Sequence, residues 1–260
     1  MEEPSKADEQ SESDEQSTSD EQSPRDERPA EETGAAPEAA APVLPPLWKR
    51  VIDLFFSPGE LFEALAITPK WLGAVLLGAV LVAAGVLLIP VEIWETQLRG
   101  VFLERGQPLP GDPSRLARIN RIAGSVGGPI VLTIIALAMA GLSTLVFAFI
   151  LGDRGRFKQY FAAVVHAFLI ASIGGLAITP LRIAAEDPQL LMSIGNALRG
   201  ILPDGYFLNV LRGLDVFGIW ANVLLAIAVT KIDPRRSFGS AFAFYMAISI
   251  GLAMITATFI

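Results

Sequence analysis

The sequence predicts an all-α polytopic membrane protein: a bundle of five transmembrane helices with interfacial amphipathic helices and a disordered N-terminal tail. Two observations lead to this fold class. Of the 260 residues, 52% are hydrophobic and only 18% are charged, a balance typical of membrane proteins. The apolar residues also gather into runs of about 20, and a helix of that length reaches about 30 Å, the thickness of the hydrocarbon core of a bilayer.

The first 47 residues differ from the rest in charge. Residues 1–47 contain 14 acidic and three basic residues, a formal charge of −11, which leaves +4 on residues 48–260 within the total of −7. Asp-Glu-Gln-Ser repeats begin at residues 8, 14 and 20, and an Ala/Pro-rich linker runs from 34 to 46. Like charge and few large apolar side chains leave little to offset the entropy of ordering. We therefore expect a disordered acidic tail before a membrane domain, with a docking or phosphorylated segment as the alternative role for the tail.

Residues 48–70 connect the tail to the first apolar run, and their pattern predicts two short helices. Ser57-Pro58-Gly59-Glu60 has the form of a capping box: Ser57 is a good N-cap, Pro58 suits the first helical position, and Glu60 stands three residues after the cap. Phe62 continues the apolar face of that helix, and Trp71 begins the first span. We expect these helices to lie on the membrane surface before the chain enters the bilayer.

Five apolar runs are long enough to span a bilayer. They cover about 71–90, 129–151, 159–180, 213–231 and 239–260. Small residues four apart, which let helices approach closely in lipid, occur on four of these runs: Ala74 and Gly78, Ala136 and Ala140, Ala171 and Gly175, and Ala247 and Gly251. The pattern predicts a packed bundle in which Pro129 opens the second span.

The connections between the runs predict the orientation. The short turns 152–158 and 231–238 each contain three Lys or Arg residues, and dense positive charge in short loops is typical of the cytoplasmic side. This puts the N-terminus inside and the C-terminus outside. The longer connections contain Asp112-Pro113 and Asp187-Pro188, and each pair predicts the start of an interfacial helix on the outer side.

A few polar residues fall within or beside the runs and are candidates for chemistry. His166 is the only histidine and lies near the middle of the third run; an intramembrane ionisable residue is a functional candidate, although a neutral imidazole can also satisfy itself on a backbone group. Arg212 and Asp215 lie three apart at the start of the fourth run, so we expect a local ion pair. Asp215 paired instead with His166 or Asn222 would indicate an ion or proton path.

Enzyme signatures are absent from the sequence. The chain has no cysteine and one histidine, so Cys-based zinc sites are excluded and we expect no metal and no cofactor. There is no P-loop, no HExxH and no dinucleotide fingerprint. A dyad of Ser143 and His166 is the one arrangement that would make an intramembrane hydrolase. The basic residues are scattered over separate loops, which gives no footprint for nucleic acid.

Three segments, in order along the chain, resemble the Yip-domain family of Ypt/Rab-interacting membrane proteins. Asp53–Phe62 before Pro69-Lys70-Trp71 is similar to the family's segment ahead of its first span, Leu151–Gln159 to its short basic turn before the third span, and Leu211–Trp220 to the opening of its fourth span. The resemblance covers about residues 48–260. It implies five spans with a cytosolic N-terminus, in agreement with the charge pattern.

The resemblance also bears on function. Eukaryotic members are tied to Rab GTPases and to traffic between endoplasmic reticulum and Golgi, whereas prokaryotic members have no settled activity. The Ala/Gly/Leu-rich spans and absent cysteines favour a prokaryotic member in the cytoplasmic membrane, to which the Rab role is not transferred; a eukaryotic member would belong to the Golgi or endoplasmic reticulum.

The sequence therefore favours a non-enzymatic scaffold that binds partners or organises the bilayer. An unknown protein partner would bind through the acidic tail or residues 48–66, and a homo-oligomer is a further possibility. The alternative is a small transporter or channel subunit using His166, Asp215 and Asn222.

Overall fold

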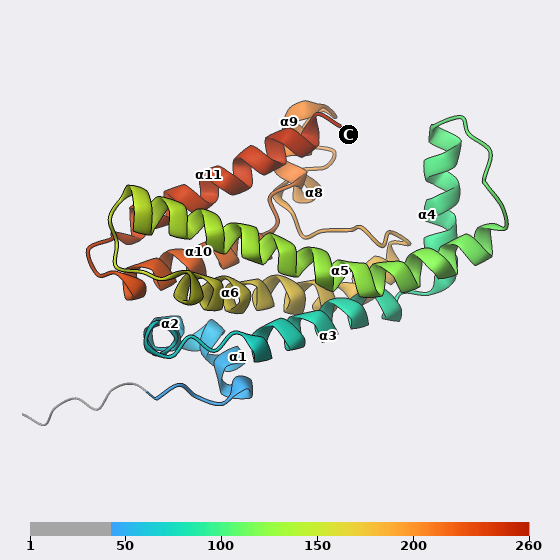
Figure 1. The fold of residues 1–260 in the computed structure, drawn as a ribbon. Coiled ribbons are helices and arrows are strands. Elements are labelled where there is room, and N and C mark those ends of the chain that lie inside the picture. The colour runs from blue at the N-terminus through green and yellow to red at the C-terminus, as the bar shows by residue number, and fades with distance from the viewer. Residues whose placement is uncertain (1–42, 260) are drawn as a thin grey trace, which may run out of the picture. The chain divides into compact units, whose positions relative to one another are not determined.

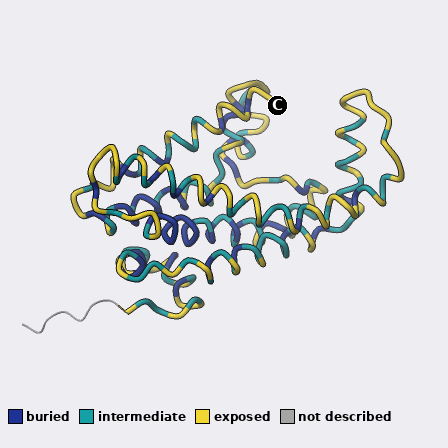
Figure 2. Tube along the Cα trace, in the orientation of Figure 1, coloured by how far each residue is buried: buried dark blue, intermediate teal, exposed yellow. Residues whose placement is uncertain are grey.

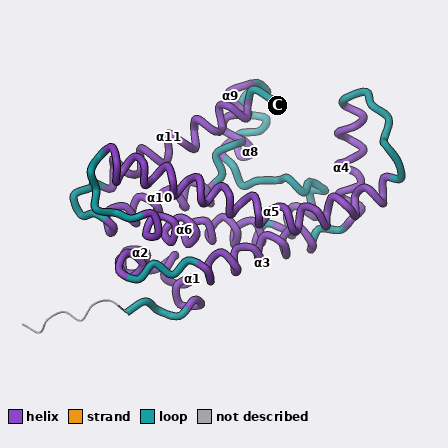
Figure 3. Tube along the Cα trace, viewed as in Figure 1, coloured by secondary structure: helices purple, strands orange, loops and turns teal. Residues whose placement is uncertain are grey.

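The structure, a computed structural model, describes residues 43–259. The tail predicted to be disordered, apart from its last residues, lies outside this range. The described part of the chain is helical, with two isolated β-bridges and no longer strand (Figure 3). This agrees with the all-α fold class that the apolar periodicity predicts.

Two short helices precede the bundle, as residues 48–70 predict. They are α1 (Leu47–Phe56) and α2 (Pro58–Ile67). In Figure 1, α2 is seen end on while the long helices run across the view, so α2 lies across the direction of the bundle. Both helices contact α6 (Phe157–Ala177), and α2 also contacts α10 (Val216–Ile232).

Each of the five predicted spans corresponds to a long helix. Besides α6 and α10 these are α3 (Leu72–Leu88), α5 (Pro113–Ser143) with its π-helical continuation η1 (Thr144–Ile150), and α11 (Phe238–Ala257). The central helix is α6, which packs against α3, α5 and α10. Its residues from Tyr160 to Ala167 are all buried, and Figure 2 shows dark, buried turns where α6 and α10 run together.

Length and apolarity qualify three helices of the described chain as membrane spans: Pro113–Ile150, Phe157–Ala184 and Phe238–Thr256. A fourth is counted if α3 and α4 (Val91–Glu104), which meet at a bend of 80°, form one broken span. The helix α10 is apolar but has only 17 residues. The protein is thus an α-helical polytopic membrane protein, and five spans remain a prediction.

The prediction that Pro129 opens the second span is wrong. Pro129 lies inside a helix that runs without a break from Pro113 to Ile150, 38 residues, or about 57 Å at 1.5 Å per residue. The helix tolerates the proline because Pro129 gives up a single backbone donor and neighbouring groups adjust. The expected outer helix and the second span are therefore one element, and Arg121 of that element donates to the carbonyl of Leu87 at the end of α3.

The second long connection also differs from its prediction. The carboxylate of Asp187 accepts from Gln189 N in a turn, and residues 188–193 are not helical. Only α8 (Ile194–Ala197) forms, capped by Ser193. Three further helices were not predicted: α4, α7 (Thr179–Ala184), which continues α6, and α9 (Tyr206–Arg212).

Two of the four small-residue pairs face the bundle as expected. Ala74, Gly78, Ala136 and Ala140 are buried, but nothing lies within 4 Å of a Cβ placed on Gly175 or Gly251. In α6 the close approach falls one residue earlier, since a Cβ on Gly174 would overlap the ring of Phe217. A one-residue shift turns a helix by about 100°, which four-residue spacing alone does not resolve.

Candidate functional site

The segment that leads into the membrane folds as predicted, except at its cap. Pro58 takes the first position of α2, but the side chain of Ser57 makes no capping hydrogen bond, so the predicted capping box is wrong. Ser57 has an irregular backbone (φ −144°, ψ 52°) because it also ends α1, where its N–H bonds to Asp53 O. Glu60 is left exposed. Phe62 is buried at 1% exposure, and Trp71 packs against Phe161 with ring centroids 5.3 Å apart.

The helix α1 has two apolar faces. Leu54 is buried and packs with the bundle core. On the other side Trp48, Ile52, Phe55 and Phe56 are exposed, Trp48 at 67% and Phe56 at 81%. Their spacing of four, seven and eight residues places them along one stripe of the helix. We call these four residues the α1 stripe; its exposed aromatic side chains on a short helix next to the spans are typical of a helix in the bilayer interface.

A buried arginine holds α1 in place. Arg50 is 8% exposed, and its Nε donates to the carbonyl of Pro45 at 2.7 Å. No carboxylate pairs with it within residues 43–259, and burial lowers the pKa of its guanidinium. The bond to Pro45 ties the start of the described chain to α1.

Beside the stripe, a cleft of about 320 Å³ opens between α1 and α2. It is lined by the carboxylates of Asp53, Glu60 and Glu63 and by the ammonium group of Lys49. Glu63 also pairs with Lys231 of α10 at 2.9 Å, which links α2 to the bundle. The cleft therefore presents more negative than positive charge next to an apolar stripe.

Two short turns at the same end of the bundle are joined by one ion pair and by hydrogen bonds that involve the backbone. Turn 151–156 follows η1 and turn 233–237 follows α10; we call them the turn junction. Arg236 binds Asp153 through Nε, at 2.7 and 2.9 Å from the two carboxylate oxygens, and donates to Leu151 O. The Asp153 side chain is fully buried. The residues are 83 positions apart, so this contact holds two hairpin ends together.

The second half of the junction is built on Asp233, which is 3% exposed. Its carboxylate accepts from the guanidinium of Arg235 and from the backbone N–H groups of Arg154 and Arg235. These bonds, the Arg235 side chain first, hold the pKa of Asp233 well below its ordinary value, and the same pairing raises the pKa of Arg235. Arg235 also donates to Gly152 O at 2.8 Å.

An aromatic cluster lies beneath the junction. Phe147 of η1 is stacked on Tyr160 at 6.1 Å and meets Phe244 edge to face at 5.0 Å. The hydroxyl groups of Tyr245 and Ser143 are hydrogen-bonded to each other at 2.9 Å, and Ser143 Oγ also donates to Met139 O. The hydroxyl of Ser143 is therefore bonded to Met139 and Tyr245, and it makes no hydrogen bond with His166. The geometry gives no support to the hydrolase alternative.

His166 lies in the core of the bundle at 0% exposure. Its Nδ1 is 2.7 Å from Ala162 O, one turn back on its own helix, and its Nε2 has no hydrogen-bond partner in the described part of the chain. The imidazole therefore makes one hydrogen bond, to the backbone of its own helix. It does not line the cavity that Asp215 and Asn222 share.

The predicted ion pair between Arg212 and Asp215 is not formed. Arg212 bonds to Asp204 at 3.1 Å and to Asn209 at 2.9 Å, while Asp215 caps α10 by accepting from Phe217 N and Gly218 N. The cap takes precedence because Asp215 precedes the first helical residue, where a carboxylate satisfies two free N–H groups.

Asp215 and Asn222 do come together in another way. Both line a cavity of about 240 Å³ between α10 and α11, at the end of the bundle away from the turn junction. The amide of Asn222 donates to Ser249 Oγ at 2.8 Å across the two helices. We call this cavity the α10–α11 cavity. His166 is not part of it, so the three residues of the transporter alternative do not form one site.

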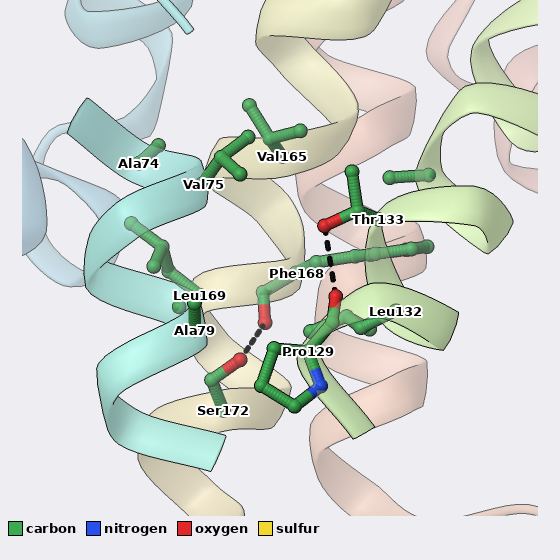
Figure 4. A pocket seen from close by; sticks show the side chains of 12 residues that line it. Ala74, Val75, Ala79, Pro129, Leu132, Thr133, Val165, Phe168, Leu169 and Ser172 are labelled. Carbon is green, nitrogen blue, oxygen red and sulfur yellow. Dashed lines mark hydrogen bonds between the residues drawn. The ribbon is translucent and has the colours of Figure 1, made fainter. Parts of the chain in front are cut away.

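Figure 4 shows a further pocket, between α3, α5 and α6, near Pro129. Its hydroxyl groups point to their own helices: Thr133 donates to Pro129 O and Ser172 to Phe168 O. The space is about 20 Å³, enough for about one water molecule. It is a packing gap rather than a ligand site.

Sequence reasoning missed the turn junction and Ser249. A signal for the junction was present, because each basic turn also contains an aspartate, Asp153 and Asp233, next to its arginines. Ser249 gave no signal, since a lone serine in an apolar run is common and its partner Asn222 is 27 residues away.

Comparison with known proteins agrees with this architecture. The Yip1 domain matches residues 52–260. The chain is also 27% identical over 176 residues to "Membrane protein YknW" of Bacillus subtilis (strain 168), an alignment that covers 67% of this chain and 74% of the relative. No solved structure matches the chain significantly. The helical bundle, its surface helices and the family match over most of the chain lead to one conclusion: the chain belongs to the Yip1 domain family.

Proposed function

We propose that this Yip1-family membrane protein is a non-enzymatic scaffold, which binds a partner protein at the surface formed by α1 and α2. The observation that carries the proposal is the α1 stripe beside the acidic cleft. The stripe would anchor α1 in the bilayer interface, and the cleft would take a basic segment of the partner, since Asp53 and Glu60 outnumber Lys49 even with Glu63 paired to Lys231.

The surroundings of this surface support a docking role. The α2 helix is fixed to α10 through Glu63 and Lys231, and the turn junction holds the neighbouring hairpin ends together. A surface built on fixed elements loses less entropy on binding than a loose one. The charge of the basic turns favours the cytoplasmic side for this end of the bundle, the side predicted for the N-terminus.

A transporter or channel subunit has less support. That function would need His166, Asp215 and Asn222 on one path, and only the last two share a cavity.

Photo-crosslinking in native membranes tests the proposal. A crosslinking residue at Glu60, in the cleft, is expected to give discrete protein adducts. The matched position is Leu103 of α4, which is 81% exposed and outside the proposed surface. Adducts at Glu60 should also disappear in Asp53→Lys, which reverses a charge of the cleft and leaves the pair of Glu63 with Lys231 in place.

The proposal fails if Glu60 gives no protein adduct, or gives the same adducts as Leu103. The absence of cysteine allows the orientation to be checked separately. Single cysteines at positions 60 and 103 should react with a membrane-impermeant thiol reagent from opposite sides of the membrane.

A further inference from the structure

The α10–α11 cavity has two polar levels separated by an apolar wall. Asp215 and Thr256 lie at one level, and Asn222 and Ser249 at the other. Each pair is seven residues from the other along its helix, a separation of about 10 Å at 1.5 Å per residue. Between them the wall is formed by Gly218, Ile219, Leu252 and Ala253. An occupant must therefore be elongated, with a polar group at each end.

The carboxylate of Asp215 keeps capacity for a cation. Both cap bonds go to one oxygen, Oδ1, at 3.0 Å each. The other oxygen, Oδ2, lies over Gly218, where a Cβ would come within 2.8 Å of it. The nearby Arg212 is bound to Asp204 and Asn209 instead. The charge on Asp215 is thus without a basic side-chain partner among the described residues.

The inner level also has unused hydrogen-bonding groups. Asn222 is 5% exposed, and its side-chain oxygen accepts no hydrogen bond within residues 43–259. Ser249 accepts from Asn222 but donates to no group in the same part of the chain, whereas Thr256 donates to Leu252 O and Ala253 O. Asn222 and Ser249 both line the cavity, so this acceptor and this donor are available to a ligand there.

The lining decides the chemistry of that ligand. A divalent metal is disfavoured, because the described chain has no group of three His, Cys, Asp or Glu residues and calcium takes six to eight oxygens. A quaternary ammonium prefers aromatic walls, and no aromatic residue lines the cavity. A primary ammonium fits better, since its N–H groups can donate to a carboxylate oxygen.

The surroundings of the cavity indicate the source of the amine. The cavity lies between two apolar helices of a membrane protein, α10 and α11, and its two polar levels are about 10 Å apart along α10. An elongated amine that enters from the bilayer is a lipid, whose ester groups lie between its headgroup and its acyl chains. We propose that the α10–α11 cavity binds a glycerophospholipid with a primary-amine headgroup, whose ammonium contacts Asp215 and whose ester oxygen accepts from Ser249.

Lipid retention in reconstituted full-length protein tests this proposal. The probes are vesicles containing phosphatidylethanolamine, its N-methyl and N,N-dimethyl forms, or phosphatidylcholine, all with identical acyl chains. After extraction, bound lipid is counted by native mass spectrometry. We expect retention to fall stepwise with methylation, and phosphatidylethanolamine to be retained about tenfold better than phosphatidylcholine, the ratio that corresponds to about 1.4 kcal/mol.

Two variants and one control assign the effect to the cavity. Asp215→Asn removes the charge but keeps a residue that caps helices well, so we expect a folded protein whose preference falls to about onefold. Ser249→Ala should lower retention several-fold while the headgroup preference stays. Asp112→Asn is the matched control: Asp112 also caps a helix through its side chain but does not line the α10–α11 cavity, and the preference of this variant should equal that of the wild type.

Equal retention of the four lipids by the wild type would overturn the proposal, as would an unchanged preference in Asp215→Asn. The methylation series uses the wild-type protein, so the test does not depend on any variant folding. Its outcome is also independent of the scaffold proposal, which concerns the other end of the bundle.

Discussion

The ion pair between Asp153 and Arg236 should contribute more to stability than its surface position suggests. The Asp153 side chain is fully buried and that of Arg236 is 23% exposed. Breaking a buried pair by removing one partner leaves an uncompensated charge and costs about 3–5 kcal/mol. Because part of Arg236 reaches solvent, we place Arg236→Ala at the lower limit, about 3 kcal/mol.

The neighbouring arginine provides the matched comparison. Arg235 pairs with Asp233 in the same junction, but its side chain is 57% exposed. Asp233 also keeps two backbone donors, Arg154 N and Arg235 N, when the Arg235 side chain is removed. Arg235→Ala should therefore cost clearly less than Arg236→Ala.

The assay is unfolding of the purified protein in mixed micelles by increasing SDS, followed by circular dichroism. Asp153→Ala, Arg236→Ala and the double variant form a cycle that isolates the pair. The double variant should cost less than the sum of the single ones, since it removes both charges. Equal losses for Arg235→Ala and Arg236→Ala, or strict additivity in the cycle, would refute the reasoning.

Three further predictions follow from the same structure. Gly174→Ala should destabilise the bundle by about 1–3 kcal/mol through overlap with Phe217, whereas Gly175→Ala, with open space around it, should be nearly neutral in the same unfolding assay; equal effects would contradict the packing. Because the pKa of Asp233 is lowered in the folded state, its contribution is present above the unfolded pKa of about 4 and is lost as pH falls below it; Asp233→Asn should flatten that acid limb, and an unchanged limb would be evidence against the pairing. Ser57→Ala should leave the protease sensitivity of α2 unchanged, because the Ser57 side chain makes no capping bond. Faster cleavage within α2 in this variant would show that Ser57 does cap the helix.

Much of the fold could be predicted because its signals are local. The apolar runs fix the five long helices, and Pro58 fixes the start of α2. Pro129 misled because a proline ends a helix in water but is tolerated inside a membrane helix, where neighbours satisfy the freed groups. The capping box at Ser57 was predicted wrongly because Ser57 also ends α1. Its residue type does not reveal that its backbone must serve two helices.

The candidate sites were harder to predict because their contacts are distant in sequence. The spacing of Arg212 and Asp215 suggested a pair, but the helix cap took the carboxylate. Asp153 meets Arg236 across 83 positions, and only the packing of α6 between its neighbours brings those turns together. The sequence shows where the polar residues lie along the chain, but their hydrogen-bond partners depend on the tertiary fold.

The position of the α1 stripe tests the central claim, that α1 lies in the bilayer interface and forms a docking surface with α2. The chain has four tryptophans, at 48, 71, 94 and 220. A variant that keeps only Trp48, with Phe at the other three, is reconstituted with lipids brominated at shallow or deep positions of the acyl chain. We predict stronger quenching of Trp48 fluorescence by the shallow bromine than by the deep one. A red-shifted Trp48 spectrum with no quenching by either lipid would place α1 in water and contradict the account.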